Sequence, residues 1–280
     1  MRVLVIGAAG MLGQDLLAAA EGAGHEPAGL DLPEIDITDA ASTRERVLEQ
    51  RPDVVINCAA WTDVDGAEEH EDRATEINGR GAGNVAAAAV EAGALAVQLS
   101  TDYSFDGHAS EPWVESSPTN PQGAYGRSKL AGEIAVAAHG PDYAIVRTAW
   151  LFGPHGKNFV DTMLRLGAER EEVTVVDDQI GCPTYTGHLA TALVEIAHRR
   201  LRGVMHVAGA GACSWYDLAV AAFERTGTAC AVKRGSTAEL GRPAPRPAYS
   251  VLGTERTDTP RLPPWEEGLA AHLAASRAVA

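Results

Sequence analysis

The fold of this chain is decided by its first residues, Arg2-Val3-Leu4-Val5-Ile6-Gly7-Ala8-Ala9-Gly10-Met11-Leu12-Gly13. The β-branched start predicts a strand, and the Ala- and Leu-rich residues that follow, to about Glu21, predict a helix. Between them the glycines follow the spacing G-x-x-G-x-x-G. Backbone without side chains can approach a pyrophosphate, and the amides of the helix N-terminus supply donors. We therefore predict a dinucleotide site at Gly7, Gly10, Met11, Leu12 and Gly13.

The next predicted strand, from about His25 to Leu30, ends at Asp31. A carboxylate at that place can accept a hydrogen bond from a ribose 2′-hydroxyl, whereas a 2′-phosphate prefers an arginine. No Lys or Arg occurs between Asp31 and Thr43. We therefore expect NADPH or NADH, with little discrimination between them. Asp36 and Ile37 follow, and two interpretations are open for them: contacts with the adenine, or a plain turn.

A third strand is predicted over Asp53-Val54-Val55-Ile56-Asn57. Small residues follow it, and they leave room for the nicotinamide-side ribose and the phosphates. We assign Ala59, Ala60 and Trp61 to the cofactor site. The acidic run between Asp63 and Asp72 is interpreted as a solvated helix start and not as a metal site. Asn78 lies in the helix that follows, either as a residue that bends it or as part of a proton relay.

A strand over Ala94-Leu95-Ala96-Val97-Gln98-Leu99 leads into Ser100-Thr101-Asp102. Hydroxyls at the carboxyl ends of parallel strands face the ligand crevice of an open α/β sheet. Tyr125 and Lys129 are four residues apart, so they share one face of a helix. An ammonium beside a phenol lowers the phenol pKa, which makes Tyr125 a candidate general acid, with Thr101 on the same carbonyl oxygen. The alternative is a half-buried aromatic residue and a solvated lysine.

These strands, with a further one over Asp142-Tyr143-Ala144-Ile145-Val146-Arg147, alternate with helices. That order predicts an α/β fold, a Rossmann-type doubly wound parallel sheet. We assign residues 1–150 to the dinucleotide-binding domain. Residues 151–280 form a smaller C-terminal substrate-binding region, with some of its helices packing back on the sheet.

Composition excludes several classes of protein. The chain has 280 residues, is 45% hydrophobic, and carries a net charge of −15 with a pI near 5.0, which argues against a nucleic-acid partner. No apolar run approaches the ~18 residues of a membrane span, so we expect a cytoplasmic protein without a membrane partner. The cysteines contain no C-x-x-C pair, so neither a zinc site nor a disulfide framework is indicated; they are Cys58, Cys182, Cys213 and Cys230.

With these motifs in place, the chain resembles the extended short-chain dehydrogenase/reductases, and within them the dTDP-4-dehydrorhamnose reductase family. The similarity covers nearly the whole length. The segment from Asp178 to Thr184 occurs in fewer related proteins than the Tyr/Lys pair, so the assignment to the narrower family rests mainly on it. The matching stretches are residues 7–13, Asn57-Cys58-Ala59-Ala60-Trp61-Thr62-Asp63-Val64-Asp65, Ser100-Thr101-Asp102-Tyr103-Ser104-Phe105-Asp106-Gly107, Tyr125-Gly126-Arg127-Ser128-Lys129, Arg147-Thr148-Ala149-Trp150, Gly156-Lys157-Asn158-Phe159, Asp178-Gln179-Ile180-Gly181-Cys182-Pro183-Thr184 and Ser214-Trp215-Tyr216.

The resemblance implies NAD(P)H-dependent reduction of the 4-keto group of a dTDP-linked deoxyhexose, with dTDP-4-dehydro-L-rhamnose as the best single substrate. Tyr125 would donate the proton, Lys129 would tune it and bind the ribose, and Thr101 would hold the carbonyl. Asp102 and Trp150 are assigned to the substrate, and Trp150 would stack on the sugar. For Arg246, in a proline-rich cationic stretch, a diphosphate clamp and an ordinary surface loop are both open.

Some members of the family hold magnesium between two subunits. Asp15 matches one ligand position, but the second region reads Thr186-Gly187-His188 where the family has a glutamate, so the ligand set is incomplete. We expect a monomer or a homodimer. Two rival functions stay open: a sister reductase that makes another dTDP-deoxysugar, and a non-catalytic nucleotide-binding regulatory subunit.

Overall fold

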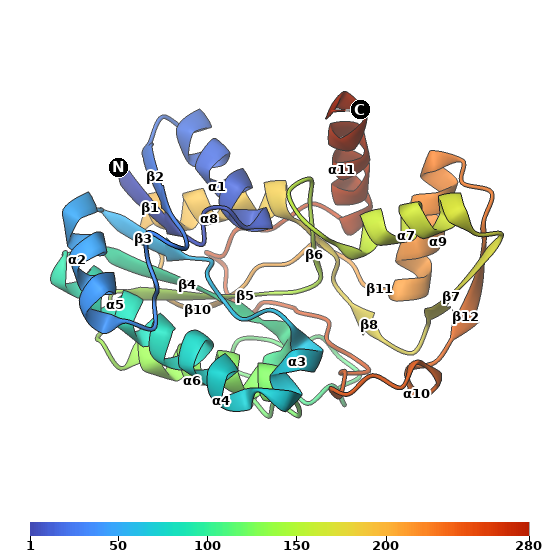
Figure 1. The fold of residues 1–280 in the computed structure, drawn as a ribbon, viewed down its shortest axis with the longest axis horizontal. Helices are drawn as coiled ribbons and strands as arrows, with labels where there is room; N and C mark the ends of the chain where they lie inside the picture. The colour runs from blue at the N-terminus through green and yellow to red at the C-terminus, as the bar shows by residue number, and fades with distance from the viewer. Residues whose placement is uncertain (280) are drawn as a thin grey trace.

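A computed structural model of the chain describes residues 1–279, with side chains described up to residue 275. Its centre is a six-stranded sheet in which every neighbouring pair is parallel. This confirms the predicted doubly wound, Rossmann-like sheet, seen edge-on at the left of Figure 1. The strands, in spatial order, are β10 (Gly203–His206), β5 (Tyr143–Thr148), β4 (Leu95–Thr101), β3 (Val54–Asn57), β1 (Arg2–Ile6) and β2 (Glu26–Leu30).

Helices cover both faces of this sheet (Figure 1). On one face lie α1 (Met11–Gly22) and α8 (Thr186–Arg199), which share an apolar core with strand residues such as Val5 and Val97. On the other face lie α2 (Ala40–Gln50), α5 (Ala82–Glu91) and α6 (Ala124–Ala137), packed over Leu4, Val55 and Ile145. Strands buried on both faces read as continuous apolar runs, which is why the sequence pattern locates them.

The C-terminal region forms a smaller lobe at the right of Figure 1, although α8 and β10 return from it to the sheet. Its short strands pair two by two: β6 with β9, β7 with β12, and β8 with β11. The division at residue 150 stays a prediction. The elements are β6 (Leu151–Phe152), α7 (Phe159–Glu169), β7 (Glu172–Val176), β8 (Ile180–Gly181), β9 (Thr184–Tyr185), β11 (Cys213–Ser214), α9 (Trp215–Thr226), β12 (Ala231–Gly235), α10 (Thr237–Leu240) and α11 (Trp265–Val279).

The acidic run forms two short helices, α3 (Val64–Glu69) and α4 (Glu71–Thr75), as its interpretation as a helix start predicts. The carboxylate of Asp63 begins α3 by accepting from the amide of Gly66 at 2.9 Å. A π-helical turn, Glu76–Gly81, then leads into α5. No helix among residues 1–279 combines the length and the apolar character that crossing a bilayer requires.

Candidate active site

A cleft of about 890 Å³ opens at the carboxyl ends of β1, β3, β4 and β5. This is where ligands bind in open α/β sheets. Of the residues assigned from the sequence, Trp61 and Arg246 do not line it. The others all do: Gly7, Gly10, Met11, Leu12, Gly13, Asp31, Asp36, Ile37, Ala59, Ala60, Thr101, Asp102, Tyr125, Lys129 and Trp150.

The glycine loop is built for close backbone approach. Gly7 has a φ of 79°, and a Cβ there would lie 2.6 Å from the amide nitrogen of Ala59. A Cβ on Gly13 would lie 2.2 Å from the carbonyl oxygen of Gly7. Gly10 caps α1 without a side-chain hydrogen bond, so the first amides of the helix face the cleft unobstructed. This cradle fits the pyrophosphate of a dinucleotide.

The end of the cleft nearest β2 holds two carboxylates. Asp31 accepts from the amides of Ala9 and Leu32, each at 2.8 Å, so it fixes the glycine loop to the end of β2. Asp36 accepts from the amide and hydroxyl of Thr38, and these bonds lower the pKa of its carboxyl group. Asp36 therefore makes a turn and also lines the cleft. Arg73 lines the cleft as well. In the sequence it directly follows the acidic run, and nothing there predicted a position in the cleft.

Thr101, Tyr125 and Lys129 meet at the other end of the cleft. Thr101 ends β4, and Tyr125 and Lys129 stand one turn apart near the start of α6. The ammonium of Lys129 is 5% exposed and donates to the carbonyl of Leu99 at 2.7 Å. Burial lowers the pKa of Lys129 to about 8, against the opposing charge of Glu133. The predicted solvated lysine alternative is therefore wrong.

The predicted acidification of the phenol is also wrong for the unliganded protein. Burial, followed by the charge of Asp102, raises the pKa of Tyr125 to about 12, and a hydrogen bond with Thr101 opposes this only in part. The nitrogen of Lys129 is engaged with a backbone carbonyl, and burial governs the phenol. Tyr125 therefore stays protonated over the whole physiological range. It can still donate to an alkoxide, which is a stronger base than a phenolate.

Asp102 is a buried carboxylate beside this group. Burial raises its pKa to about 6, and its Oδ1 accepts from the hydroxyl of Thr101 at 3.1 Å. The hydroxyl of Ser250 also acts on this carboxylate and opposes the rise in its pKa. Among residues 1–275, the hydroxyl of Thr148 has no hydrogen-bond partner, and it lines the cleft beside Asp102. Because unpaired buried polar atoms are rare, Thr148 is suited to a bound hydroxyl-bearing ligand.

Trp150 lines the cleft in an unexpected way. Its φ is 49°, in the left-handed region, and its indole stacks on Trp215 with 3.6 Å between ring centroids and 4° between planes. A Cβ on Gly181 would lie 2.4 Å from Cε2 of the same indole. Trp215 therefore occupies one face of the indole, and the backbone of Gly181 lies close to the same ring. Stacking of a sugar on Trp150 stays a prediction, and on the face that Trp215 occupies it requires the pair to open.

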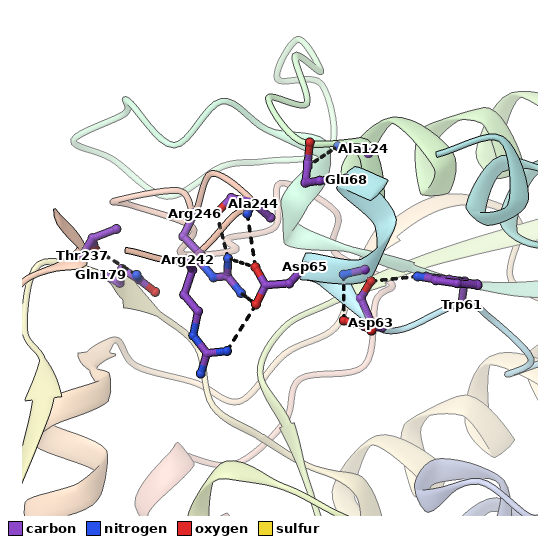
Figure 2. Close-up of polar contacts among 11 residues, drawn as sticks. Trp61, Asp63, Asp65, Glu68, Ala124, Gln179, Thr237, Arg242, Ala244 and Arg246 are labelled. Carbon is purple, nitrogen blue, oxygen red and sulfur yellow. Dashed lines mark hydrogen bonds and ion pairs between the residues drawn. The ribbon is translucent and has the colours of Figure 1, made fainter. Parts of the chain in front are cut away.

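The two assigned residues outside the cleft have structural contacts. The backbone of Trp61 exchanges two hydrogen bonds with the side chain of Asn78, at 2.8 and 3.1 Å, and Asn78 also donates to Ser128 of α6 at 2.9 Å. Asn78 thus ties the loop after β3 to the catalytic helix. The indole of Trp61 donates to the carbonyl of Asp63, as drawn in Figure 2.

Arg246 is paired with Asp65 (Figure 2). Its guanidinium donates to the two carboxylate oxygens at 2.6 and 2.9 Å, and it is 14% exposed. Side-chain hydrogen bonding from Arg246 lowers the pKa of Asp65. Three of the five N–H groups of Arg246 are used, two on Asp65 and one on the carbonyl of Ala244, so the Nε–H and one Nη2–H are left for a diphosphate.

A second ion pair lies beneath the catalytic group. Glu133 and Arg147 form two hydrogen bonds, at 2.9 and 2.7 Å, with both side chains almost fully buried. Glu133 also accepts from the hydroxyl of Ser100, next to Thr101. The sequence could not reveal this pair, because nothing local marks either residue as buried. It fixes α6 to β4 and β5.

Asp15, which matches one magnesium position of the family, pairs with a histidine of the same chain. Asp15 lies 3.5 Å from the imidazole of His155. Among the described residues, no group of three or more His, Cys, Asp or Glu side chains is placed to hold a metal ion. We derive no step that involves magnesium.

Comparison with known proteins places these motifs in a family. The model described as "RmlD substrate binding domain" matches residues 1–278. The chain belongs to this family. Its RmlD relatives include a dTDP-4-dehydrorhamnose reductase of Mycobacterium tuberculosis, 44% identical over 98% of this chain and 93% of the relative. A dTDP-4-keto-6-deoxy-D-glucose reductase of Streptomyces niveus is 45% identical over 91% of this chain and 85% of its own length.

A solved structure extends this likeness to the fold. The dTDP-4-dehydrorhamnose reductase of Bacillus anthracis, solved in complex with NADP, superposes with a TM-score of 0.95 at 41% identity. The match covers 98% of this chain and 99% of that one. The resemblance to the extended short-chain dehydrogenase/reductases is thereby confirmed for the whole described chain.

Proposed function

We propose that this protein reduces the 4-keto group of a dTDP-linked 6-deoxyhexose, with dTDP-4-dehydro-L-rhamnose as the preferred substrate and NADPH or NADH as reductant. One observation carries the proposal: a single cleft joins the glycine cradle to Thr101, Tyr125 and Lys129. The family relationship and the NADP complex of the Bacillus anthracis relative support it.

The bound nicotinamide cofactor supplies a hydride. The cofactor is held by the amides at the start of α1 and by Asp31 at the end of β2. Lys129 holds the ribose of the nicotinamide half while its ammonium remains fixed to the carbonyl of Leu99. Small residues Ala59 and Ala60 leave room for that half of the cofactor.

The substrate carbonyl lies between Thr101 and Tyr125. Negative charge develops on its oxygen during reduction, and the hydroxyl of Thr101 and the phenol of Tyr125 stabilise it by hydrogen bonds. The phenol then gives up its proton to that oxygen. Thr148 has an unused hydroxyl for the hydroxyls of the sugar, and Asp102 lines the cleft beside it. Trp150 and Trp215 form the apolar wall of the same region.

The choice among dTDP-4-keto sugars depends on small differences in the pocket. One hydroxyl or methylene changes transition-state binding by only a few kcal/mol, about 1 to 3 in a hydrophobic pocket. The relatives include both rhamnose-forming and other deoxysugar reductases, so the sister reductase is the second candidate.

The test is turnover with a panel of dTDP-4-keto sugars, followed by the loss of NADPH absorbance. We expect the highest kcat/KM for dTDP-4-dehydro-L-rhamnose. Preference for another sugar would favour the sister reductase. NADPH binding without oxidation by any member of the panel would favour the regulatory subunit. The cytoplasmic location and the monomeric or homodimeric state remain predictions.

A further inference from the structure

The segment 242–251, which we call the strap, joins β8 of the C-terminal region to the loop after β4 and to α3. Its middle is held to β8, because Ile180 donates to the carbonyl of Ala248 and accepts from the amide of Ser250, each at 2.8 Å. The amide of Tyr249 donates to the carbonyl of Gly107, in the loop after β4, at 3.1 Å. The strap therefore runs from the substrate lobe to the catalytic side of the sheet.

Asp65 is the polar anchor at the start of the strap. Besides the two bonds from Arg246, its carboxylate accepts from the amide of Ala244 at 3.1 Å and lies 3.4 Å from Arg242 (Figure 2). The same helix, α3, presents Glu68 to the amide of Ala124, the first residue of α6, at 2.7 Å. One short helix therefore holds both the strap and the start of the catalytic helix.

Prolines of the strap pack against glycines beside the catalytic group. A Cβ on Gly123, two residues before Tyr125, would lie 3.4 Å from Cγ of Pro245. A Cβ on Gly107 would lie 2.5 Å from Cα of Pro247. At Gly107 this approach is possible only because the residue has no side chain, whereas Pro245 lies at ordinary contact distance from Gly123.

Tyr103 lies in the loop that the strap contacts. Its ring packs edge-on against Tyr125, with 5.6 Å between centroids and 81° between planes, and it lines the cleft. Gly107, which the strap holds at Pro247 and Tyr249, follows four residues later in the same loop. The contacts thus run from Asp65 and Arg246 through the strap to the loop of Tyr103, and from Tyr103 to the proton donor.

We propose that Asp65 and Arg246 form a latch that holds the strap against the loop after β4 and the start of α6, and that they are thereby positioning residues for Tyr103. This inference rests on the proposed function for its kinetic consequence. It gives Arg246 an indirect role: the guanidinium remains on Asp65 while substrate is bound and does not bind the diphosphate itself. A bidentate, half-buried pair suits such a role because its geometry is fixed.

The test compares Asp65→Asn, Arg246→Gln and the double variant, with Arg242→Gln as the matched control. Arg242 is 56% exposed, and its guanidinium lies 3.4 Å from the same carboxylate. We expect each single variant to raise the KM for dTDP-4-dehydro-L-rhamnose about tenfold, and the double variant to be no worse than either, since both remove one interaction. The kcat and the Kd of NADPH should stay within about threefold of wild type, and the control within about twofold. Arg246→Lys, which keeps the charge without the fork, should fall between Arg246→Gln and wild type.

Two kinetic outcomes would overturn the latch. If Arg246→Gln raises the KM while Asp65→Asn leaves it unchanged or lowers it, Arg246 binds the diphosphate directly. If all variants fold and keep the wild-type KM, the pair has no part in substrate binding.

Amide hydrogen exchange gives a readout that does not need turnover. In the unliganded protein, Asp65→Asn and Arg246→Gln should both speed exchange across residues 242–251, including the amide of Ala244, whereas Arg242→Gln should not. If no keto sugar is reduced, the proposed function fails, and this exchange alone decides the latch. Wild-type exchange rates in both variants would refute it.

Discussion

Replacing Lys129 by methionine should separate the stability of this fold from its activity. The folded protein lowers the pKa of the lysine from 10.5 to about 8, chiefly by burial. At about 1.4 kcal/mol per pKa unit, holding the ammonium there costs about 3 kcal/mol. Methionine has a similar length and no charge, but it leaves the carbonyl of Leu99 without its donor. We therefore expect the free energy of unfolding at neutral pH to rise by about 2 kcal/mol, with loss of reductase activity and weaker NADPH binding.

The free energy of unfolding of the wild type should depend on pH in a direction that follows from the lowered pKa of Lys129. Because the pKa is lower in the folded state, the unfolded state binds more protons between the two values, and wild-type stability rises with pH across that window. The variant lacks this rise. In urea unfolding, the excess in the free energy of unfolding of the variant over wild type should therefore shrink between about pH 8 and about pH 10. A variant less stable than wild type at neutral pH, or an advantage that does not change with pH, would refute the reasoning.

Four further results are expected. Tyr125→Phe should reduce kcat by at least about a hundredfold, with NADPH affinity and thermal stability near wild type, because only the proton-donating hydroxyl is removed and the ring is kept. Discrimination between NADH and NADPH should stay within roughly one order of magnitude, or ~1.4 kcal/mol; a larger preference in measured kcat/KM would show that the ribose pocket around Asp31 is misinterpreted. Trp150→Ala should raise the KM for the sugar and leave the Kd of NADPH unchanged; the opposite pattern contradicts its assignment. Gly181→Ala pushes a methyl into the indole of Trp150 and should lower stability by about 1 to 3 kcal/mol in thermal unfolding, while Gly22→Ala, with open space at its Cα, should not.

The sequence predicts the dinucleotide half of this protein well, because the signals there are local. The strand from Arg2 to Ile6 and the glycine loop after it are observed as predicted. The strand that carries Thr101 is slightly longer than predicted, ending at Thr101 and not at Leu99, because Ser100 and Thr101 pair with β5. The spacing of Tyr125 and Lys129 likewise needs only the geometry of one helix.

What the sequence could not supply depends on contacts between distant residues. Asp65 and Arg246 are 181 positions apart, and the acidic run around Asp65 is indistinguishable from a solvated helix. Trp150 lies between β5 and β6, and its partner is Trp215, the first residue of α9. The pKa of Tyr125 was predicted with the wrong sign because burial is a property of the folded protein, whereas the nearby lysine is visible in the sequence.

The return of α8 and β10 to the sheet has a consequence for exchanging parts between reductases of this kind. The wall of Trp215 and Gly181 lies after residue 150, so a chimera joined there would seem a simple way to change the sugar. However, Leu189, Leu193 and Met205 come from the same half and belong to the core under α1. A recombined chain would therefore import a foreign core surface along with the new pocket. To change the substrate range, a recombined chain must therefore exchange the short segments that carry Gly181 and Trp215 separately. Otherwise it must take α1 from the same parent as the C-terminal half.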